Sequence, residues 1–407
     1  MVFLYDLGLL IYSLFIRLAS LKNKKARKWL EGRKNLFRAV AGAVDTSERS
    51  IWFHFASLGE FEQGRPVLEQ LKKKRPNSKV VITFFSPSGY EIRKDYALAD
   101  HVFYLPLDTQ KNASEFIRLI NPEIAVFTKY EFWHHYFRTL HEKNIPLFLI
   151  SAIFRKDQIF FKWYGSLQRK TLHYVSHFFT QTNDSKELLK SIGIFNATVA
   201  GDTRFDRVAE NAQNAMYLPI FEAFGKGKRV FVGGSTWPED EDLLRGLASK
   251  HPDWKFIVAP HEIQQARIEM IEQKFPSAIR YSRITESSQP IDEQTVIIDN
   301  IGMLASLYRY GNVAFIGGGF GAGIHNTLEA AAFGLPVIFG PKHEKFQEAK
   351  DLISVGGGFS VRDEHELAHC VTKLLENNNL EKAGTAAQQY VYSKTGATGI
   401  ILSRILS

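Results

Sequence analysis

The sequence contains almost no cysteine, which excludes one common way of stabilising a fold. Cys370 is the one cysteine among 407 residues, so the chain cannot form an internal disulfide. Proteins built without disulfides are typical of reducing compartments, and we expect a cytoplasmic setting. Cys370 lies in the helical pattern ELAHCVTKLL, which favours a thiol packed into a core over a reactive one.

Two phosphate-binding signatures are missing from the glycine-rich segment FIGGGFGAGIHNTLEAAAFGLPVIFGP at residues 315–341. The segment has no Gly-Lys-Ser/Thr ending of a P-loop, and its glycines do not follow the dinucleotide spacing G-x-G-x-x-G. The pattern predicts a strand, a glycine turn, and a helix that carries Asn326 and Glu329 on one face. Such a turn either lets backbone N–H groups approach a phosphate or forms a tight strand-to-helix corner.

Metal-binding signatures are incomplete. His134, His135 and His141 form the only histidine cluster, and neither a cysteine nor an H-E-x-x-H motif completes a zinc site. Residues 240–242 read Asp-Glu-Asp, the D-x-D metal–nucleotide signature of some sugar-transferring enzymes. They follow Pro238 at a predicted helix start, where acids complement the helix dipole, so we expect no metal there.

Positive charge is present, and it is concentrated in the first half of the chain. Residues 1–210 hold 32 Lys and Arg against 21 Asp and Glu, whereas residues 211–407 hold 19 against 22. The first half is therefore expected to meet an anionic partner, such as a phospholipid surface, a phosphorylated lipid or a nucleic acid.

The N-terminal segment is apolar and is followed by a basic one. Residues 2–15 are apolar apart from Tyr5, Asp6, Tyr12 and Ser13, and residues 17–38 carry nine basic side chains against one acid. This order is the reverse of a secretory signal, and the apolar run is shorter than the ~20 residues that span a bilayer. We predict an interfacial or barely spanning anchor with its basic flank on the cytoplasmic leaflet. A buried first helix is the alternative, because Asp6 is unfavourable in lipid.

Short apolar runs alternate with helical patterns along the rest of the chain. Strands are predicted at 51–57, 80–85, 123–128, 146–152 and 177–182, and again at 229–234, 255–260, 295–299, 313–318 and 336–340. This alternation predicts an α/β protein with two doubly wound parallel sheets facing a central cleft. The predicted division is an anchor with its basic flank at 1–35, domains at 36–210 and 228–407, and a linker at 211–227. Ligands of such sheets bind beyond the carboxyl ends of the strands.

In the first half, segments after predicted strands carry the candidate functional residues. HFASLGEFEQGRP at 54–66 places Glu60 at a turn into a helix, either as a carboxylate facing the cleft or as an acid that complements the helix dipole. His54 lies within the strand and is interpreted as a core histidine. GDTRFDRV at 201–208 supplies either salt-bridged linker residues or cations that reach the cleft. The aromatic and basic run at 158–179 either cradles an acylated, phosphorylated acceptor or covers the sheet.

In the second half, VFVGGSTWPEDED at 230–242 repeats the strand, the glycine pair and a helix start. Its hydroxyls, Ser235 and Thr236, suit an anion site and equally suit an N-cap. Two later loops offer further candidates for binding, namely Pro260, His261, Gly302, Met303 and Leu304.

Together these segments resemble the 3-deoxy-D-manno-octulosonic acid (Kdo) transferases, which move Kdo from CMP-Kdo onto lipid A precursors in Gram-negative bacteria. The resemblance covers nearly the whole chain. It is carried, in order, by SLGEFEQGRP at 57–66, SPSGYE at 86–91, EFW at 131–133, GDTRFD at 201–206, GGSTW at 233–237, APHE at 259–262 and HNTLEAAAFGLPVIFGP at 325–341.

The resemblance implies a GT-B fold, in which the first Rossmann-like domain binds the acceptor and the second binds the nucleotide donor. It implies an inverting transfer of Kdo to a lipid A precursor (lipid IVA) in the inner core of lipopolysaccharide, at the cytoplasmic face of the cell inner membrane. It implies no cofactor, no metal and no nucleic acid partner.

The resemblance also implies roles for individual residues. Glu60 falls on the general base, and Arg204 falls where the family places a cation that stabilises the leaving phosphate. Lys129 stands where many members carry an acid, so it is expected to bind the Kdo carboxylate or an acceptor phosphate instead. The residues that align with the CMP-binding loops are Ser235, Thr236, Pro260, His261, Gly302, Met303, Leu304, Asn326 and Glu329. Glu329 suits the ribose hydroxyls.

Three other functions remain open at this point. The chain could be another GT-B enzyme that uses a UDP-sugar with a lipid-linked acceptor, a GT-B-like sugar-nucleotide epimerase, or a membrane-associated nucleotide binder without catalysis. A UDP-sugar carries a diphosphate, so an enzyme that uses one needs loops that bind it. An epimerase needs neither an anchor nor a basic first half.

Overall fold

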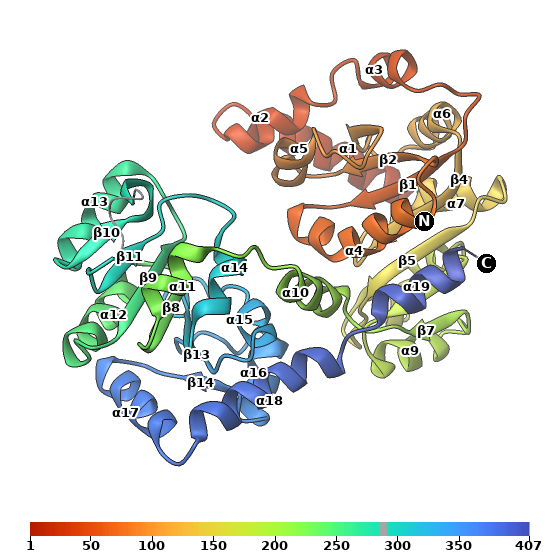
Figure 1. Ribbon diagram of the computed structural model, residues 1–407. Coiled ribbons are helices and arrows are strands. Elements are labelled where there is room, and N and C mark those ends of the chain that lie inside the picture. The colour runs from red at the N-terminus through yellow and green to blue at the C-terminus, as the bar shows by residue number, and fades with distance from the viewer. Residues whose placement is uncertain (285–290, 407) are drawn as a thin grey trace. The chain divides into compact units, whose positions relative to one another are not determined.

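The structure is a computed structural model that describes residues 1–284 and 291–406. The chain forms two units (Figure 1). Unit 1 comprises Met1–Asp206 together with the C-terminal segment that begins at Gly396, and unit 2 comprises Arg207–Thr395. Each unit contains one seven-stranded sheet whose paired strands are all parallel.

The sheet of unit 1 has the strand order β3-β2-β1-β4-β5-β6-β7. Its strands are β1 Ser50–Phe55, β2 Lys79–Phe84, β3 His101–Tyr104, β4 Pro122–Thr128, β5 Leu147–Ala152, β6 His177–Thr180 and β7 Ala197–Val199. The helices of unit 1 are α1 Val2–Ala19, α2 Lys24–Glu31, α3 Leu36–Ala43, α4 Leu58–Lys74, α5 Pro87–Arg93, α6 Gln110–Ile120, α7 His134–Glu142, α8 Ser166–Leu172, α9 Asn183–Lys190 and α19 Ala397–Ile405, with the short 3-10 helix η1 Ile159–Phe161. Helix α10, Thr203–Gln213, begins in unit 1 and continues into unit 2.

The sheet of unit 2 has the strand order β10-β11-β9-β8-β12-β13-β14. Its strands are β8 Val230–Thr236, β9 Lys255–Pro260, β10 Ala278–Arg280, β11 Thr295–Ile297, β12 Val313–Ile316, β13 Val337–Phe339 and β14 Gly358–Ser360. Its helices are α11 Pro219–Gly225, α12 Pro238–Lys250, α13 Gln265–Lys274, α14 Leu304–Leu307, α15 Leu328–Ala332, α16 Gln347–Ser354, α17 Glu364–Leu375 and α18 Asn379–Ser393, with the 3-10 helices η2 Tyr281–Arg283 and η4 Tyr308–Tyr310.

The strands of unit 1 are apolar on both faces, because helices cover both faces of the sheet. Trp52 points into a core shared with α6 and α7, whereas its neighbours Ile51 and Phe53 point into a core shared with α4 and α19. Successive side chains of a strand alternate between faces, so a continuous apolar run fills both cores. Burial on both faces therefore explains why the sequences of the central strands are uninterrupted apolar runs.

The domain division differs from the predicted one at the C-terminus. The predicted second domain ended at residue 407, whereas α19 packs in unit 1, where Ile401 and Leu402 are buried against the α4 side of the sheet. The carboxylate of Asp206 holds this segment by accepting hydrogen bonds from the backbone N–H and the hydroxyl of Thr398, both at 2.7 Å. The predicted linker at 211–227 contains helix α11 and lies within unit 2.

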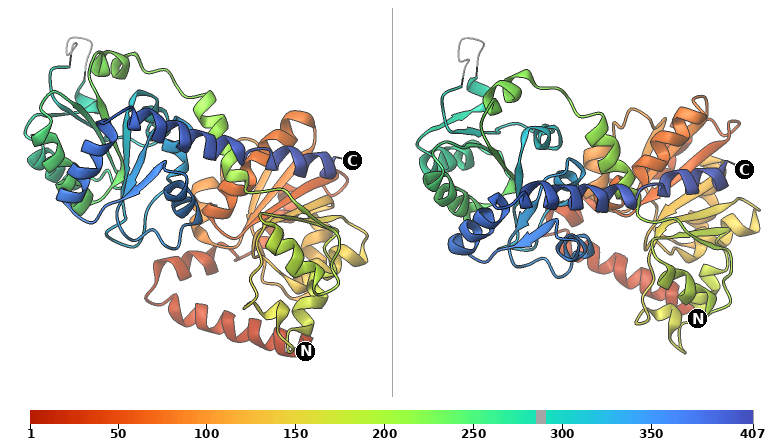
Figure 2. Two further views of the ribbon diagram at one scale, coloured as in Figure 1. Left: turned by 90° about the horizontal axis from the view of Figure 1, so that it is seen from below. Right: turned by 60° about the horizontal axis from the view of Figure 1, so that its bottom comes forward.

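The predicted N-terminal anchor forms the single helix α1. By length and composition this helix can cross a membrane, because its 18 residues have a mean hydropathy of 1.8, and only 6% of them are buried. The alternative of a buried first helix is therefore wrong. Figure 2 shows α1 in red, running beside α2 along unit 1.

Candidate functional site

Glu60 lies in the first turn of α4, directly after the carboxyl end of β1. Ser57 is the N-cap of this helix, and its hydroxyl donates a hydrogen bond to the Glu60 carboxylate instead of capping a helix N–H group. The Glu60 side chain is half-buried. The carboxylate is therefore oriented by one neutral donor and remains reachable by a ligand, while its position also suits the helix dipole.

Lys129 follows β4 in a strained backbone conformation. Its φ is 59°, in the left-handed region, and its N–H donates to the carbonyl of Ile150 at 3.0 Å. A left-handed lysine is uncommon and persists where the surrounding structure fixes it, which is a feature of functional sites. Burial raises the pKa of the adjacent Tyr130; the nearby Glu60 carboxylate raises it further, and Arg155 opposes the shift. The loop after β4 thus lies within electrostatic reach of Glu60.

Arg204 lies at the start of α10. Its guanidinium Nε donates to Oδ2 of Asp202 at 2.9 Å, and its backbone N–H donates to Oδ1 of the same carboxylate. The preceding Thr203 is buried, and its hydroxyl donates to the carbonyl of Gln63 in α4. The GDTRFD segment is therefore ion-paired, and it is fixed against the helix that carries Glu60. The Arg204 side chain is still 38% exposed.

A chain of hydrogen bonds connects β1, β2 and the EFW segment. The Glu131 carboxylate accepts from the indole Nε1 of Trp133 at 2.8 Å and from Nε2 of His54 at 3.1 Å. His54 Nδ1 then accepts from the Thr83 hydroxyl at 2.8 Å. His54 is fully buried, so the interpretation as a core histidine with satisfied hydrogen bonds is confirmed. Glu131 is engaged by two ring N–H groups, whereas Glu60 is oriented by a single hydroxyl.

In unit 2 the glycine turn after β12 is hydrogen-bonded to β8 and to the start of α12. The N–H of Gly317 donates to the carbonyl of Gly234, and that of Gly318 donates to the buried carboxylate of Asp240 at 2.9 Å. The N–H groups of Gly321 and Gly323 both donate to the carbonyl of Gly318. These four N–H groups are used within the protein and do not form a phosphate cradle.

Close backbone packing explains why Gly317 is a glycine. A Cβ added there would lie 2.3 Å from the carbonyl oxygen of Ser235 and 2.7 Å from the Cα of Thr236. The turn therefore packs directly on the carboxyl end of β8, where no side chain fits.

Ser235 and Thr236 have different environments at this end of β8. The buried Thr236 hydroxyl donates to Glu241 at 3.1 Å and is already satisfied. Ser235 is half-buried, has a left-handed φ of 52°, and its hydroxyl has no hydrogen-bond partner within the described ranges 1–284 and 291–406. Of the two hydroxyls, Ser235 is the one that can bind a ligand.

Three aromatic rings contact one another near the end of β9. His261, which is exposed, stacks on Trp237 at 4.9 Å and on His325 at 4.3 Å between ring centroids. The indole Nε1 of Trp237 donates to Nε2 of His325 at 3.0 Å. Because an indole only donates, the neutral His325 carries its proton on Nδ1. Burial, and then the nearby His261, lowers the pKa of His325, which favours this neutral form.

The acids of the D-x-D string each have a protein partner. Asp240 accepts from the N–H groups of Trp237 and Gly318, Glu241 pairs with Arg267, and Asp242 pairs with Lys274 at 2.6 Å. The helix-start interpretation of these acids agrees with the Trp237 contact. Among the described residues, no group of three or more His, Cys, Asp or Glu side chains is placed to hold a metal ion.

Asn326 and Glu329 meet, although not as predicted. Asn326 precedes α15, which begins at Leu328, so the expectation that both lie on one helix face is wrong. The Asn326 amide instead donates to Glu329 at 3.0 Å and accepts from the Leu328 N–H at 3.1 Å. An Asx-type turn replaces the first helical turn that the spacing suggested.

The remaining predicted residues lie at the same edge of the unit 2 sheet. Pro260 ends β9, and the N–H of His261 donates to the carbonyl of Thr236 at 3.0 Å. Met303 is the N-cap of α14, and a Cβ added at Gly234 would lie 3.3 Å from Leu304. Gly302 has a φ of 99°, which favours glycine. Within each unit, the structure therefore brings the predicted residues to the carboxyl edge of one sheet, where α/β folds bind ligands.

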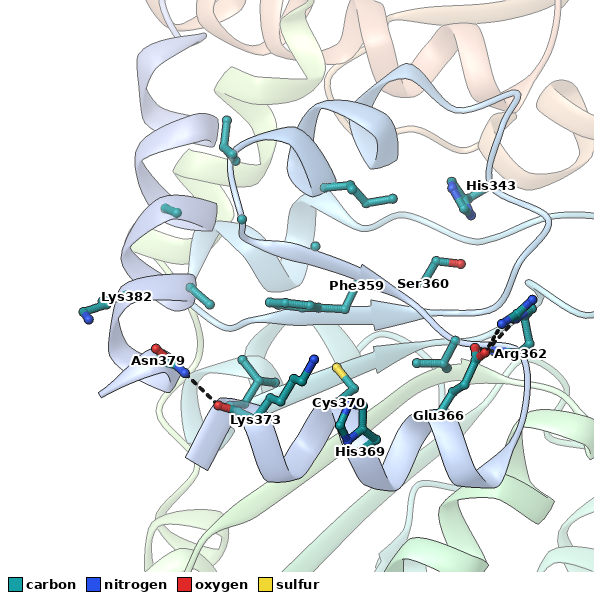
Figure 3. Close-up of a pocket in the computed structure, with 18 of the residues that line it drawn as sticks. His343, Phe359, Ser360, Arg362, Glu366, His369, Cys370, Lys373, Asn379 and Lys382 are labelled. Atoms are coloured by element: carbon teal, nitrogen blue, oxygen red, sulfur yellow. Dashed lines mark hydrogen bonds and ion pairs between the residues drawn. The ribbon is translucent and has the colours of Figure 1, made fainter. Parts of the chain in front are cut away.

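A large cavity in unit 2 contains none of the predicted residues. It has a volume of about 1000 Å³ and is bordered by β14, α17 and α18, and Phe359, Cys370, Lys373 and Lys382 are among the residues that line it (Figure 3). Cys370 packs against the core of unit 2, and burial raises the pKa of its thiol to about 12. Cys370 is partly buried and packs against the core, which agrees with the interpretation of a packed thiol.

Sequence reasoning missed several residues that shape these sites. Trp237 and His325 lie inside motifs that the sequence singles out, so their proximity to candidate residues was a usable signal. No local signal connects Asp240 with Gly318, because the two are 78 positions apart and meet only in the folded sheet. Ser57 lies in the same motif as Glu60, but its donation to Glu60 requires a side-chain rotamer that the sequence does not specify.

Comparisons with known proteins agree with this architecture. Residues 18–207 match the family described as 3-deoxy-D-manno-octulosonic-acid transferase (kdotransferase). The 3-deoxy-D-manno-octulosonic acid transferase of Aquifex aeolicus is 28% identical over 80% of this chain and 86% of its own length. The enzyme of the same name from Haemophilus influenzae is 26% identical over 94% of this chain and 92% of its own length.

Solved structures share the fold at low identity. UDP-GlcNAc 2-epimerase from Neisseria meningitidis superposes with a TM-score of 0.61 at 18% identity, covering 88% of this chain and 99% of the epimerase. MurG from Acinetobacter baumannii gives a TM-score of 0.55 at 12% identity, with the same coverage of both chains. At such identities these similarities establish the fold alone.

Two parallel seven-stranded sheets, each with polar residues gathered at its carboxyl edge, form a GT-B fold. The similarity to Kdo transferases supports a glycosyltransferase on this fold. The chain is similar to the Kdo transferases, through the family model over residues 18–207 and through relatives that match 80–94% of its length. The resemblance to the Kdo transferases that the sequence motifs carry is thereby confirmed.

Proposed function

We propose that the protein transfers Kdo from CMP-Kdo to a lipid A precursor, lipid IVA, with inversion at the anomeric carbon. The observation that carries the proposal is the half-buried Glu60 carboxylate, which Ser57 orients at the carboxyl end of β1. A carboxylate held this way by one neutral hydroxyl can accept a proton from an approaching sugar hydroxyl. The names of the relatives supply Kdo as the transferred sugar.

The reaction needs three groups from unit 1. Glu60 takes the proton of the acceptor hydroxyl while the oxygen of that hydroxyl forms a bond to the anomeric carbon of Kdo. The bond between that carbon and the CMP phosphate breaks, and its electron pair leaves with the phosphate. Arg204, fixed by Asp202 and still partly exposed, stabilises the negative charge that grows on the phosphate. Lys129, held in its left-handed conformation after β4, binds the Kdo carboxylate or an acceptor phosphate.

Unit 2 holds CMP in this proposal. Ser235 offers a free hydroxyl, His261 an exposed ring on an aromatic support, and Glu329 a carboxylate for the ribose hydroxyls. The supporting loop residues are Thr236, Pro260, Gly302, Met303, Leu304 and Asn326. The glycine turn favours a nucleotide with one phosphate over a UDP-sugar, because four of its N–H groups already bind protein acceptors. We propose that catalysis uses no metal and occurs at the cytoplasmic face of the inner membrane, in lipopolysaccharide biosynthesis.

The proposal is tested by incubating detergent-purified protein with CMP-Kdo, with and without a tetraacylated lipid A precursor. We expect CMP release to require the lipid, and the lipid mass to increase by whole Kdo units. Turnover with a UDP-sugar, and none with CMP-Kdo, would refute CMP-Kdo as the donor and identify a UDP-sugar instead.

The variant Glu60→Gln tests the base. It keeps the size of the side chain but cannot accept the proton, so turnover should fall by about 100-fold or more, with CMP affinity unchanged in calorimetry. Glu62→Gln is the matched control, because Glu62 lies on the same helix and pairs with Arg65 and Arg93 at the surface. Glu62→Gln should leave turnover within about twofold. Equal turnover in wild type and Glu60→Gln would refute the assigned base.

A further inference from the structure

The cavity beside β14 lies at the edge of the unit 2 sheet. β14 is the last strand of this sheet, so in the described part of the chain no further strand pairs with its outer side. The cavity, of about 1000 Å³, is bordered there by α16, α17 and α18 (Figure 3). This volume is at the upper end of the range for small-molecule sites. None of the residues assigned to Kdo transfer lines the cavity, so the two sites are separate.

Glycines let the surrounding helices close on the start of β14. A Cβ added at Gly357 would lie 2.7 Å from the backbone N of Ala387 in α18, and one added at Gly358 would lie 2.8 Å from the Cβ of Leu352 in α16. Both helices therefore pack directly on the backbone, where no side chain fits. The cavity is thus walled by packed secondary structure and is a fixed part of the fold.

The walls of the cavity are largely apolar. The apolar residues that line it include Ile353, Val355, Phe359, Val361, Cys370 and Leu374. Val361 and Leu374 are buried, but Ile353 is 39% exposed and Val355 is 45% exposed. Phe359 and Cys370 pack against the core and are only partly covered by it. Apolar side chains that remain uncovered in a concave surface are typical of ligand-binding sites.

The cavity is elongated along α17. Glu366 and Leu374 both line it and are eight positions apart on this helix. At a rise of 1.5 Å per residue, the lining extends for about 12 Å, or roughly two helical turns. Figure 3 shows Arg362 and Glu366 toward one end of this stretch and Asn379 toward the other. A long apolar surface suits an extended hydrocarbon chain better than a compact ring system.

Positive charge is in excess at the cavity. Arg362, Lys373 and Lys382 line it against the single acid Glu366. Glu366 already binds Arg362, whose Nε donates to the Glu366 carboxylate at 2.7 Å. In the described part of the chain, Lys373 and Lys382 have no acidic partner within ion-pair distance. This surplus is local, because residues 211–407 hold 22 Asp and Glu against 19 Lys and Arg.

Lys373 directs its ammonium group toward the apolar wall. Figure 3 shows the side chains of Lys373 and Cys370 extending from α17 toward Phe359. Burial raises the pKa of the Cys370 thiol, and the Lys373 ammonium opposes that rise, so the two groups lie within electrostatic reach of each other. An ammonium group beside an apolar surface complements a ligand with an acidic head group and a hydrocarbon chain.

We propose that this cavity binds the anion of a fatty acid, with the carboxylate on the Lys373 ammonium and the alkyl chain along Phe359 and Leu374. A peptide strand added to the sheet is a poorer fit, because β14 offers an edge of only three residues. The proposal does not rest on Kdo transfer, since none of its residues has a role in that reaction.

Isothermal titration calorimetry with sodium dodecanoate tests the cavity. The full chain is kept in CHAPS, a detergent without an alkyl chain, and no nucleotide is added. We expect one binding site, and each methylene added between octanoate and dodecanoate should tighten binding by about threefold to fourfold. The methyl ester of dodecanoic acid lacks the charge and should bind roughly tenfold more weakly. Equal affinities for octanoate and dodecanoate would overturn the proposal, because the chain would then not be buried.

Three variants locate the bound anion. Lys373→Met keeps the apolar stem and removes the charge, so dodecanoate should bind roughly tenfold more weakly and no more tightly than its methyl ester. Lys226→Met is the matched control, because Lys226 is an exposed lysine of unit 2 that does not line the cavity, and it should bind as wild type does. Ala386→Trp places a large ring on the α18 wall and should abolish binding of both ligands.

Two results would assign the cavity differently and overturn the proposal. Unchanged dodecanoate affinity in Lys373→Met or in Ala386→Trp would place the fatty acid on another apolar surface of the chain. Dimers that dissociate on Ile353→Glu, in a protein that binds no dodecanoate, would assign the cavity to a second copy of the chain.

Turnover separates this proposal from the proposed function. With CMP-Kdo and the lipid A precursor, Lys373→Met should release CMP as wild type does. Dodecanoate binding by a protein that transfers no Kdo would refute the proposed function and leave the fatty-acid site standing.

Discussion

At the scale of single residues, hydrogen-bond partners distinguish Glu60 from Glu131, two glutamates that each follow a strand of the unit 1 sheet. Glu131 accepts from the ring N–H groups of His54 and Trp133, and its side chain is 15% exposed. Within the described part of the chain, the hydroxyl of Ser57 is the donor that orients Glu60. Two ring N–H groups hold the Glu131 carboxylate in place, so Glu131 positions the loop after β4, and Glu60 is the residue that we propose as the base.

We predict that Glu131→Ala destabilises unit 1 by about 1–3 kcal/mol, because it leaves the buried His54 and the Trp133 indole without an acceptor. Glu131→Gln retains a carbonyl oxygen and should be less destabilising. Urea unfolding of the full chain measures both. Equal stability of the two variants would show that the His54 and Trp133 bonds do not depend on the Glu131 oxygen.

At the scale of elements, Asp240 connects the start of α12 with the glycine turn after β12. Its carboxylate accepts from the N–H of Trp237 at 2.8 Å and of Gly318 at 2.9 Å. Burial raises the pKa of Asp240 from 3.8 to about 6, although both N–H groups act in the opposite direction. The folded protein therefore binds this proton more tightly than the unfolded chain does.

The consequence is a pH dependence of stability. The stabilisation from protonated Asp240 is complete below pH 3.8 and is lost as the pH rises through about 6. Asp240→Asn cannot ionise but keeps one oxygen for both N–H groups. Relative to wild type, the variant should gain roughly 1–1.5 kcal/mol of unfolding free energy between pH 5 and pH 7.5. Urea unfolding at the two pH values checks this, and a constant difference between the proteins would contradict it.

At the scale of the whole molecule, the chain passes from unit 1 to unit 2 near Asp206 and returns near Gly396. Asp206 lies at the first crossing and binds the N–H of Thr398 just after the second. The last helix, α19, then completes the core beside α4 with Ile401, Leu402 and Ile405. Unit 1 therefore cannot complete its core until the last residues of the chain are present.

Replacing one buried residue of α19 tests this dependence. Ile401 is fully buried, so Ile401→Ala should lower the unfolding free energy by about 2–5 kcal/mol. The neighbouring Ile400 is 41% exposed, and Ile400→Ala should change it by less than about 1 kcal/mol. Urea unfolding compares the two variants. Similar losses from both would indicate that α19 contributes through its helix alone and not through the buried face.

The sequence by itself determined the ten strands nearest the centre of the two sheets, the parallel α/β class and the resemblance to the Kdo transferases. These strands are buried on both faces, so each reads as an unbroken apolar run. The four strands that it missed, β3, β7, β10 and β14, are the edges of the sheets. They have only three or four residues each and are partly exposed, so they lack that run.

Only the tertiary structure decided which residues share a site and which segments share a core. The sequence marked Glu60, Arg204, Ser235 and His261 because strand ends and helix starts are local patterns. It did not assign α19 to unit 1, join Asp240 to Gly318, or direct Asp6 toward His135. Each of these contacts joins residues far apart in the chain, and packing selects them only after the sheets have formed.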